Sequence, residues 1–461
     1  MQLTTSFALL LIHFHSVFSA PSFQSFSLVM TGWIMSSRPR FVTECILSGS
    51  TAPTKHFTCF HRLFAIAIWS LDSLCGILAH LIVQTFLPNG TIHLAVDDTL
   101  CYKRGLHIYA TGMHYDPLRS SKRKRSTSWG HDWVTVSILV RGLPWCPNKV
   151  WALPIAFRLY KNQQGNRKAN KNLPTPTEGS PSTQRKSAQP KHQTRPELAS
   201  ELLKMVACWF PDRQLSVSGD SLYGGQSIAK HLPAKMDLIS RVHAKGAMYD
   251  FAPTKPKGQR GRRKKKGERL SGMLEWAKDS QPWEEMNFKR FGLNAHVQIK
   301  SRKCLYYGVT NDRPVTVVLV EDLVGKRPMS MFYATDIHLT PRQILEQYAD
   351  RWATEVMYRD VKQSLGFQDP ANRTEKAVRR TAPMALVLYS LIVVWAHQGG
   401  HSSIRYPDRP WYRKKAEPSF ADLLSAVRRE SCRENLSREW PKDAPANNSW
   451  EQWLDLACRA A

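Results

Sequence analysis

Acidic residues are scarce in this sequence. Its 461 residues include 37 Asp and Glu against 65 Lys and Arg, which leaves a formal net charge of +28. A folded chain with so large an excess of one charge repels itself unless a polyanion is its usual partner. Because phosphate contacts supply most of the non-specific affinity of such proteins, the composition predicts binding to nucleic acid. A basic protein of a membrane surface or of the ribosome is the alternative.

Cysteine pairs with the spacing of metal ligands are also missing. The nine cysteines lie far apart and none stands in a Cys-x-x-Cys pair, which argues against a zinc ribbon. An odd and scattered set of cysteines is typical of free thiols in a reducing compartment. We therefore expect a cytoplasmic location.

The N-terminus lacks the basic residues that begin a signal peptide. An apolar run at Phe7–Ile12 and the residues Ser19-Ala20-Pro21 imitate one, but the first Lys or Arg is Arg38. We expect a buried N-terminal helix, with export as the alternative. Runs of membrane-spanning length are missing too. The best candidate, Ala382–Ala396, has 15 residues, fewer than the roughly 20 that a span needs, and it predicts a core helix.

The chain is long enough for two or three domains, and its texture changes along its length. Residues 1–90 are apolar, predict a helical N-terminal region and end at the turn signal Pro88-Asn89-Gly90. Runs typical of a catalytic core follow at 91–227, interrupted by a polar linker at 161–195. The remaining segments are a mostly β block at 228–340, helices at 341–400 and a polar tail at 401–461.

The segment 91–227 predicts a mixed sheet. It contains three strand-like runs, then a helix, then a further strand. These runs are Ile92–Val96, Trp133–Val140, Trp151–Tyr160, Pro196–Phe210 and Gln214–Ser218. The pattern indicates an α/β fold in which acidic residues follow the first and last strands.

Three carboxylates stand out by their positions. Asp98 ends the strand in LAVDDT, Asp220 ends the strand in LSVSGD, and Glu355 lies on a predicted helix. Phosphodiester cleavage needs metal ions, held about 3.5–4 Å apart, that activate the attacking oxygen and stabilise the leaving one. Carboxylate oxygens suit Mg²⁺ or Mn²⁺. Each residue alone is better explained as a turn residue or helix cap, and spacing does not separate Asp98 from Asp97.

The helix around Glu355 carries a row of functional groups. Arg351, Glu355 and Lys362 follow Tyr348 at offsets of 3, 7 and 14 residues. At about 100° per residue, all four share one narrow stripe of the helix. Such a face can hold a metal ion through its carboxylate while its cations bind phosphates. The alternative is a solvated face laced with ion pairs, such as Arg351 with Glu355.

This pattern, Tyr-x2-Arg-x3-Glu-x6-Lys, resembles the signature helix of a large group of bacterial insertion-sequence transposases. These are DDE enzymes with an RNase H-like core, and all four signature positions match. LAVDDT resembles the strand of the group's first aspartate, which threonine follows directly, and this favours Asp98 over Asp97. VSGDSLYGG resembles the strand of the second, Asp220. The resemblance covers roughly residues 91–369 and does not reach the first ninety residues.

The resemblance implies a fold, an activity and a set of partners. The fold would be an RNase H-like mixed sheet flanked by helices, with a mostly β insertion at 228–340. The activity would be DNA transposition that depends on Mg²⁺, for which Mn²⁺ can substitute, with no small-molecule cofactor. The partners would be the element ends and target DNA, bound by a dimer on paired ends. The location would be the bacterial cytoplasm, at the nucleoid.

The resemblance also implies roles for individual residues. Asp98, Asp220 and Glu355 would be catalytic and hold the metal ions. Tyr348, Arg351 and Lys362 would contact terminal phosphates of the DNA. Some members stack a flipped base on a tryptophan of the insertion, for which the candidates are Trp276 and Trp283.

Other functions remain open at this point. The basic runs Lys122–Arg125 and Arg262–Lys266 predict loops that contact phosphates with low specificity, while a solvated loop or a nuclear-import signal is the alternative. A metal-dependent nuclease would cut DNA without joining it. A non-catalytic or inactivated element product would bind DNA without needing the carboxylates.

Overall fold

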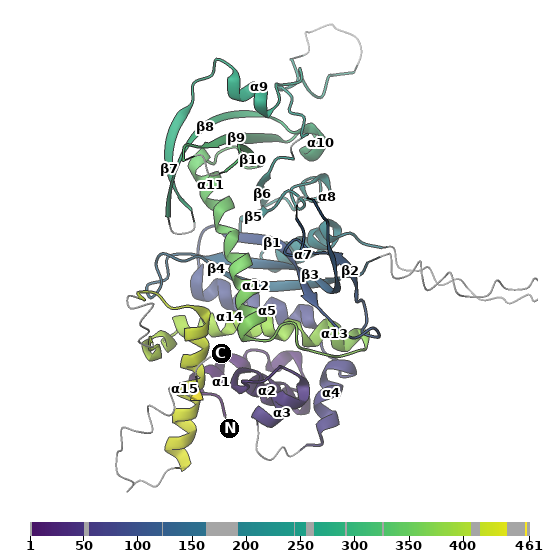
Figure 1. The fold of residues 1–461 in the computed structure, drawn as a ribbon, viewed down its shortest axis with the longest axis vertical. Coiled ribbons are helices and arrows are strands. Elements are labelled where there is room, and N and C mark those ends of the chain that lie inside the picture. The colour runs from purple at the N-terminus through teal and green to yellow at the C-terminus, as the bar shows by residue number, and fades with distance from the viewer. Residues whose placement is uncertain are drawn as a thin grey trace, which may run out of the picture.

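The protein extends from a helical region through a large sheet to a β-rich end, as the computed structural model shows (Figure 1). The structure describes residues 2–49, 55–121, 123–162, 192–243, 245–254, 262–290, 293–324, 327–406, 415–439 and 457–458. Most of the predicted linker at 161–195, and Lys122 of the first basic run, therefore lie outside the described residues.

The N-terminal region is helical, as predicted. Its helices are α1 (Thr5–Ile12), α2 (Ala20–Met35), α3 (Val42–Gly49), α4 (Phe57–Ala65) and α5 (Leu71–Phe86). Helix α1 packs on α14 (Pro383–His397), where the Trp395 indole donates a hydrogen bond of 2.9 Å to the Ser6 hydroxyl. Trp33 of α2 is fully buried, and its indole donates to the carbonyl of Leu365 at 2.8 Å. The apolar N-terminal segment is thus part of the main core.

Five strands form the centre of a ten-stranded sheet. Strand β1 (Ile92–Tyr102) pairs with antiparallel β3 (Thr127–Val140) on one side and with parallel β5 (Leu215–Gly219) on the other. Strand β4 (Trp151–Tyr160) extends the sheet beyond β3, and β6 (Met236–Arg241) runs parallel to β5. The short β2 (Gly112–Tyr115) also pairs with β3. The order β4-β3-β1-β5-β6, in which β3 alone is reversed, is that of the predicted RNase H-like core.

Helices cover both faces of this core. Helix α7 (Arg195–Trp209) packs against β3 and β4, while α12 (Trp352–Ser364) contacts β1 and β4 from the opposite face. A capping box begins α7: Thr194 accepts a bond from the Glu197 amide, and the Glu197 carboxylate accepts one from the Thr194 amide. These reciprocal bonds define the start of the helix and make Arg195 its first residue.

The apolar helix α14 lies inside the protein. All its residues from Pro383 to Ala396 are buried, which confirms the predicted core helix. Among the described residues, Glu375–His397 is the one helical stretch long and apolar enough to cross a membrane, yet 89% of its apolar window is buried within the protein. A helix that is apolar all round and enclosed by the rest of the protein is a core helix.

The β-rich insertion continues the core sheet. Strand β10 (Ser330–Ala334) pairs with β6, and β9 (Pro314–Asp322), β8 (Leu293–Leu305) and β7 (Glu284–Arg290) follow in antiparallel order. The short helices α8 (Gln226–Ala229), α9 (Met273–Lys278) and α10 (Tyr307–Thr310) lie between strands. The boundary expected at residue 228 precedes β6, which the structure pairs with the core. The insertion therefore begins after Arg241. The sequence did not show this, because a pattern of apolar residues does not reveal which strands pair.

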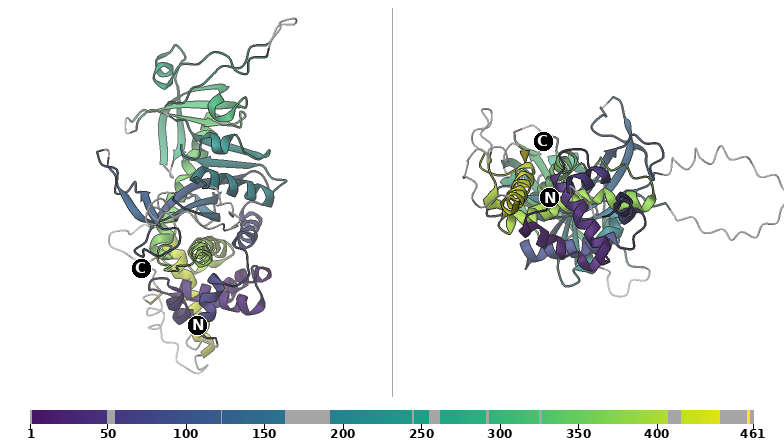
Figure 2. Two further views of the ribbon diagram at one scale, coloured as in Figure 1. Left: turned by 90° about the vertical axis from the view of Figure 1, so that its right-hand side faces the viewer. Right: turned by 90° about the horizontal axis from the view of Figure 1, so that it is seen from below.

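Helices α11 (Pro341–Asp350) and α12 run end to end from the insertion to the core (Figures 1 and 2). At their junction, the amide of Arg351 donates to the carbonyl of Tyr348, and the amide of Thr354 donates to the carbonyl of Arg351. These hydrogen bonds span three residues and tighten the helix locally. The single long helix expected from Pro341 is thus divided at Arg351.

The last described helices complete the packing on α14. Helix α13 (Glu375–Thr381) precedes it, and α15 (Phe420–Glu439) packs against it. Phe420, Leu423 and Val427 are buried there. The segment 401–461 was expected to be a polar tail, but it contains this packed helix. The sequence hid the helix because charged residues are interspersed among its apolar ones.

Replacing Trp33 with Phe should lower the free energy of unfolding by about 1–3 kcal/mol, because the buried Leu365 carbonyl loses its donor. Urea denaturation of both proteins measures the change. The control is Phe57→Leu, at a side chain 53% exposed, which should change stability by about 0.5 kcal/mol or less. An equal effect of the two changes would show that the indole bond does not join α2 to the end of α12.

Candidate active site

Neighbouring residues of β1 present their side chains to opposite faces of the sheet, because a strand alternates. Asp97 pairs with Thr135 of β3, and the side chains of both contact α12. Asp98 pairs with Val134, and its side chain faces the start of α7. The two aspartates of the Asp-Asp-Thr motif therefore belong to different surroundings.

The sequence predicted that Asp98 ends its strand. In the structure both aspartates lie within β1, which continues past them. The strand continues to Tyr102 because β3 keeps pairing with it as far as Gly130. Pairing with β5 stops earlier, at Val96 and Gly219. Beyond Val96 this edge of β1 is open toward the loop after β5, which begins with Asp220.

On the α12 face, one guanidinium joins two carboxylates. Arg351 donates from Nη1 to Oδ2 of Asp97 at 2.5 Å and from Nη2 to Oε1 of Glu355 at 3.4 Å. The side chains of Asp97 and Arg351 are 15% and 14% exposed, while Glu355 is 40% exposed. Glu355 thus lies at the open side of the site, and the ion pair with Asp97 lies beneath it.

Two further residues of α12 hold this helix against β1. The Tyr358 hydroxyl donates to the backbone carbonyl of Asp97 at 3.1 Å and lies 2.6 Å from the Thr135 hydroxyl. The Lys362 amine donates to Thr99 Oγ1 at 2.7 Å and to the carbonyl of Leu100 at 2.8 Å. These bonds fix the distance between the strand that bears Asp97 and the helix that bears Glu355.

On the α7 face, Asp98 belongs to a second cluster of charges. Its Oδ1 accepts a hydrogen bond from the Tyr223 hydroxyl at 2.5 Å, and its Oδ2 lies 3.6 Å from Nε of Arg195. The same Nε donates to Oδ2 of Asp132 at 2.5 Å. Asp132 and the neighbouring His114 are buried. Asp98 is therefore engaged in a packed ion-pair cluster.

Asp220 begins the loop between β5 and α8 and is half-buried. Its Oδ1 accepts the backbone amides of Leu222 at 2.9 Å and Tyr223 at 3.3 Å. The turn closes against β6, where the Ser240 hydroxyl donates to the Asp220 carbonyl at 2.8 Å. A Cβ at Gly224 would lie 2.1 Å from that hydroxyl, so close approach explains the glycine.

Burial and like charge disfavour the ionised forms of these carboxyls. Burial raises the pKa of Asp97 to about 7, Arg351 opposes this shift, and the charges of Asp98 and Asp220 add to it. Burial, followed by the charge of Asp132, raises the pKa of Asp98 to about 7, against Arg195. Burial also raises the pKa of Glu355, and the charge of Asp220 adds to the shift. The charge of Asp220, which follows the β5 partner of Val96, adds to the shift at all three carboxyls.

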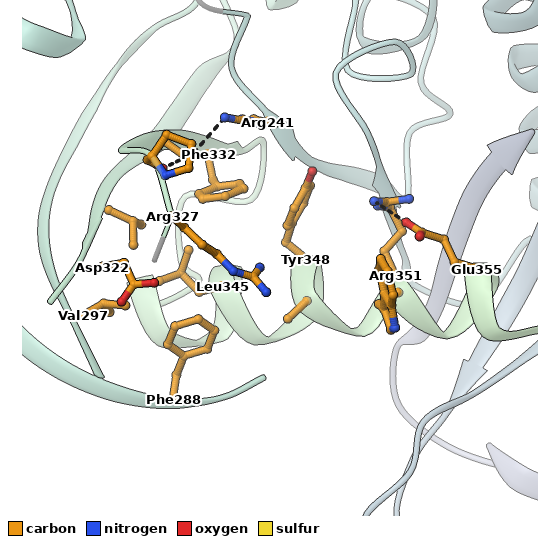
Figure 3. A pocket seen from close by; sticks show the side chains of 15 residues that line it. Arg241, Phe288, Val297, Asp322, Arg327, Phe332, Leu345, Tyr348, Arg351 and Glu355 are labelled. Carbon is orange, nitrogen blue, oxygen red and sulfur yellow. Dashed lines mark hydrogen bonds and ion pairs between the residues drawn. The ribbon is translucent and has the colours of Figure 1, made fainter. Parts of the chain in front are cut away.

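A cavity of about 500 Å³ opens beside Glu355, between the insertion and α11 (Figure 3). Tyr348, Arg351 and Glu355 line its helical side, Phe288, Phe332 and Arg327 line the side of the insertion, and Arg241 lines it from the end of β6. The Arg351 guanidinium lies 5.7 Å from the centre of the Tyr348 ring. Three members of the predicted stripe thus meet at one cavity, whereas Lys362 lies against β1, beyond the junction at Arg351.

The tryptophans of the insertion do not line this cavity. Trp276 is fully buried under the Arg302 guanidinium, 3.9 Å from its ring centre. It presents no ring face to a base, which removes one of the two stacking candidates. Trp283 is half-buried, with the buried amine of Lys300 5.1 Å from its ring centre.

Several residues of the site carry no signal in the sequence. Arg195 stands at the end of a polar linker and Asp132 at the start of an apolar strand, so neither looks functional by position. Tyr358 had a weak signal, because it follows Glu355 by three residues and so shares its side of the helix. The clusters depend on pairing between distant strands, which no local pattern contains.

Asp97, Asp220 and Glu355 fit a divalent metal by their chemistry. They supply oxygen ligands of the kind that Mg²⁺ and Mn²⁺ prefer. The raised pKa values of Asp97 and Glu355 indicate a deficit of positive charge that Arg351 only partly meets. Within the residues that the structure describes, no three His, Cys, Asp or Glu side chains are already arranged as a metal cluster.

The sequence matches the family described as DDE superfamily endonuclease over residues 14–310, more than half of the chain. The chain belongs to this family. The match includes Asp97, Asp98 and Asp220, and it starts within the helical N-terminal region, where the sequence had shown no resemblance. Residues 296–400, which include Glu355, match a second family, described as archaeal putative transposase ISC1217.

The two matches confirm the expectation of a DDE transposase of the insertion-sequence type. The finer assignment to the Tyr-Arg-Glu-Lys group stays a prediction. A search of curated proteins returned no match. Among solved structures, a piggyBac transposase synaptic complex with hairpin DNA matches 100% of this chain and 82% of its own, with a TM-score of 0.39 and 10% identity.

Replacing Arg195 with Ala should lower the free energy of unfolding by about 3–5 kcal/mol at pH 8, because buried Asp132 and partly buried Asp98 lose their shared cation. The loss should be smaller at pH 5. Carboxyls whose folded pKa is raised favour folding below their unfolded pKa, and this contribution disappears as the pH rises through the folded value. Urea denaturation at both pH values measures the difference.

Two further variants serve as controls, one for the loss of a positive charge and one for the carboxylate that Arg195 contacts. Arg359→Ala, at an arginine on α12 that is 58% exposed, should have little effect at either pH. Asp132→Asn in the Arg195→Ala background should recover part of the stability at pH 8. Equal losses at pH 5 and pH 8 would contradict an electrostatic role for Arg195.

Proposed function

We propose that this DDE endonuclease is a transposase that cleaves DNA at the ends of its element and joins the freed ends to target DNA. One observation carries the proposal. Asp97 and Asp220 directly follow the paired residues Val96 and Gly219, and Arg351 joins Asp97 to Glu355, which lines a cavity with arginines and a tyrosine. Carboxylates for metal ions next to cations for phosphates are the parts that phosphoryl transfer requires.

The first metal ligand is one of the two aspartates of β1. The Asp-Thr pattern favours Asp98, whereas side-chain orientation favours Asp97, which faces Glu355 across the Arg351 guanidinium. Asp98 already has Tyr223 and Arg195 as partners. We therefore propose Asp97, Asp220 and Glu355 as the metal ligands, with Asp98 as a residue that positions the strand.

Bound Mg²⁺ ions would activate the attacking oxygen and stabilise the leaving one. The protein's own residues bind, orient and neutralise. Tyr358 and Lys362 keep β1 and α12 at a fixed separation, so that Asp97 and Glu355 are held in place before DNA arrives. Such prior ordering reduces what the reaction must spend on positioning.

The cavity supplies the contacts to DNA. Arg241, Arg327 and Arg351 bring positive charge to its walls, and Tyr348 brings a hydroxyl and an aromatic ring. Guanidinium groups bind phosphate oxygens in pairs, which fixes the strand without reading its sequence. Contact between Lys362 and a phosphate, implied by the resemblance, stays a prediction, because its amine here donates to β1.

The partners belong to the same proposal. The net charge of +28 suits a protein that holds several segments of DNA at once. We expect a dimer on paired element ends and a location at the bacterial nucleoid. The exposed residues Arg123–Arg125 and Arg262–Lys265 are placed to add phosphate contacts outside the cavity.

The test is cleavage and joining of a DNA fragment that carries the element's flanking ends, with Mg²⁺ present. Asp97→Asn, Asp220→Asn and Glu355→Gln should each lower the cleavage rate by a factor on the order of 10³ or more, while DNA binding is retained. Omitting Mg²⁺ should abolish cleavage by the wild type. Asp322→Asn, at a cavity carboxylate outside the proposed triad, measures the effect of losing a nearby charge.

Asp98→Asn decides between the two aspartates. It should leave most of the activity, because it keeps the size and the hydrogen bond to Tyr223. If Asp98→Asn abolishes cleavage and Asp97→Asn does not, Asp98 is the ligand.

The products separate the related functions. Strand-transfer products identify a transposase, and cleavage without joining identifies a nuclease. Binding of the ends without cleavage in any protein would identify an inactive element product. Cleavage that survives all three ligand substitutions would rule out this metal site.

A further inference from the structure

The position of Arg351 is unusual for a residue that is expected to hold DNA. Its guanidinium is buried between Asp97 and Glu355, with contacts of 2.5 Å and 3.4 Å. Its Nε is buried and has no hydrogen-bond partner among the described residues. A buried donor without a partner is costly, so the guanidinium is incompletely satisfied in this position.

The guanidinium and a metal ion need the same ligands. Asp97 and Glu355 are two of the three carboxylates proposed to bind the metal, and Arg351 contacts both. A carboxylate oxygen directed at a guanidinium is not directed at a metal ion. In this structure Oδ2 of Asp97 and Oε1 of Glu355 are therefore engaged by Arg351.

A second position for the guanidinium lies next to the first. Arg351 lines the cavity of about 500 Å³ on the side of Glu355 and Tyr348 (Figure 3). The Tyr348 ring centre lies 5.7 Å from the guanidinium and offers a face on which a cation can stack. The cavity is also where the DNA phosphate is expected, so a guanidinium that turned into it would gain a new anionic partner.

We infer that Arg351 is a stand-in cation: it occupies the metal position when no metal is bound and moves to a DNA phosphate when the metal enters. This inference rests on the proposed function, because it needs Asp97 and Glu355 to be metal ligands. It assigns Arg351 two states that exclude each other. The metal-free protein is stabilised by the ion pairs, and the loaded protein uses the same side chain to hold DNA.

The two states couple metal binding to DNA binding. A metal ion must displace Arg351 and so binds the free protein more weakly than the carboxylates alone would allow. A DNA phosphate that accepts Arg351 removes this competition. Because such coupling is reciprocal, DNA raises the affinity for metal by the same factor by which metal raises the affinity for DNA. Metal loading is thereby favoured on DNA and suppressed off it.

The first experiment measures Mn²⁺ affinity without DNA, from free Mn²⁺ detected by electron paramagnetic resonance. Arg351→Gln should bind Mn²⁺ about tenfold more tightly than wild type, within the usual range of coupling between sites. Arg351→Lys should lie closer to wild type. The matched control is Arg359→Ala, which removes one charge from the exposed side of the same helix and should change the affinity little. Equal or weaker binding by Arg351→Gln overturns the inference.

Glu355→Gln separates failure of this inference from failure of the proposed function. It should abolish most of the specific Mn²⁺ binding. If wild type and Glu355→Gln bind Mn²⁺ alike, the metal site itself is wrong. If Glu355→Gln loses binding while Arg351→Gln gains none, the metal site stands and the stand-in role fails.

A second measurement uses wild-type protein and so does not depend on how a variant folds. Phenylglyoxal modifies accessible guanidinium groups, and mass spectrometry reports the extent at each arginine. Adding Mn²⁺ without DNA should increase modification of Arg351 severalfold relative to Arg359. Adding a short duplex of the element end together with Mn²⁺ should protect Arg351 again. No change at Arg351 with Mn²⁺ alone overturns the inference.

Discussion

Repulsion between partly buried carboxylates is the constraint on which this structure depends. Asp97, Asp98, Asp220 and Glu355 lie close enough that the charge of one raises the pKa of another. Such a group is stable only if cations lie beside it or if some members stay neutral. The fold meets this need with one guanidinium on each face of β1, Arg351 from the α11–α12 junction and Arg195 from the first turn of α7. Both helices are therefore tied to the same strand by charge as well as by packing.

Much of the architecture could be predicted from local patterns. Continuous apolar runs located α14, β3 and β4, apolar residues at helical spacing located α7, and the turn signal after Leu87 separated the helical region from the sheet. Patterns of this kind depend on which residues face the core, and that is a local property of each element. Such patterns do not show which strands pair, so the pairing of β6 with β5 and of β10 with β6 was not predicted.

The candidate site was predictable to the same degree. The positions of Asp220 and Glu355 followed from motifs, and three of the four stripe residues meet at one cavity. The orientation of Asp97 and Asp98 was not available, because it depends on how far β3 continues beside β1. Lys362 lies about two turns beyond Glu355 on the same side of α12, so it reaches Thr99 and Leu100 of β1 and does not line the cavity. The role of Arg195 could not be predicted, because its contact with Asp98 depends on where α7 begins and how it packs on the sheet.

The doublet of acids in β1 has a consequence for how the site tolerates change. A strand that slips by one residue exchanges the side chains of its two faces, which usually destroys a site. In β1 a slip by one residue brings either Asp98 or Val96 to the place of Asp97, so one of the two possible shifts still presents an acid to α12. Asp220 lies between Gly219 and Ser221, and Glu355 lies between Thr354 and Val356, so neither has a neighbouring substitute. Insertions and deletions of a single residue should therefore be tolerated unevenly across the three parts of the site, with β1 the most forgiving.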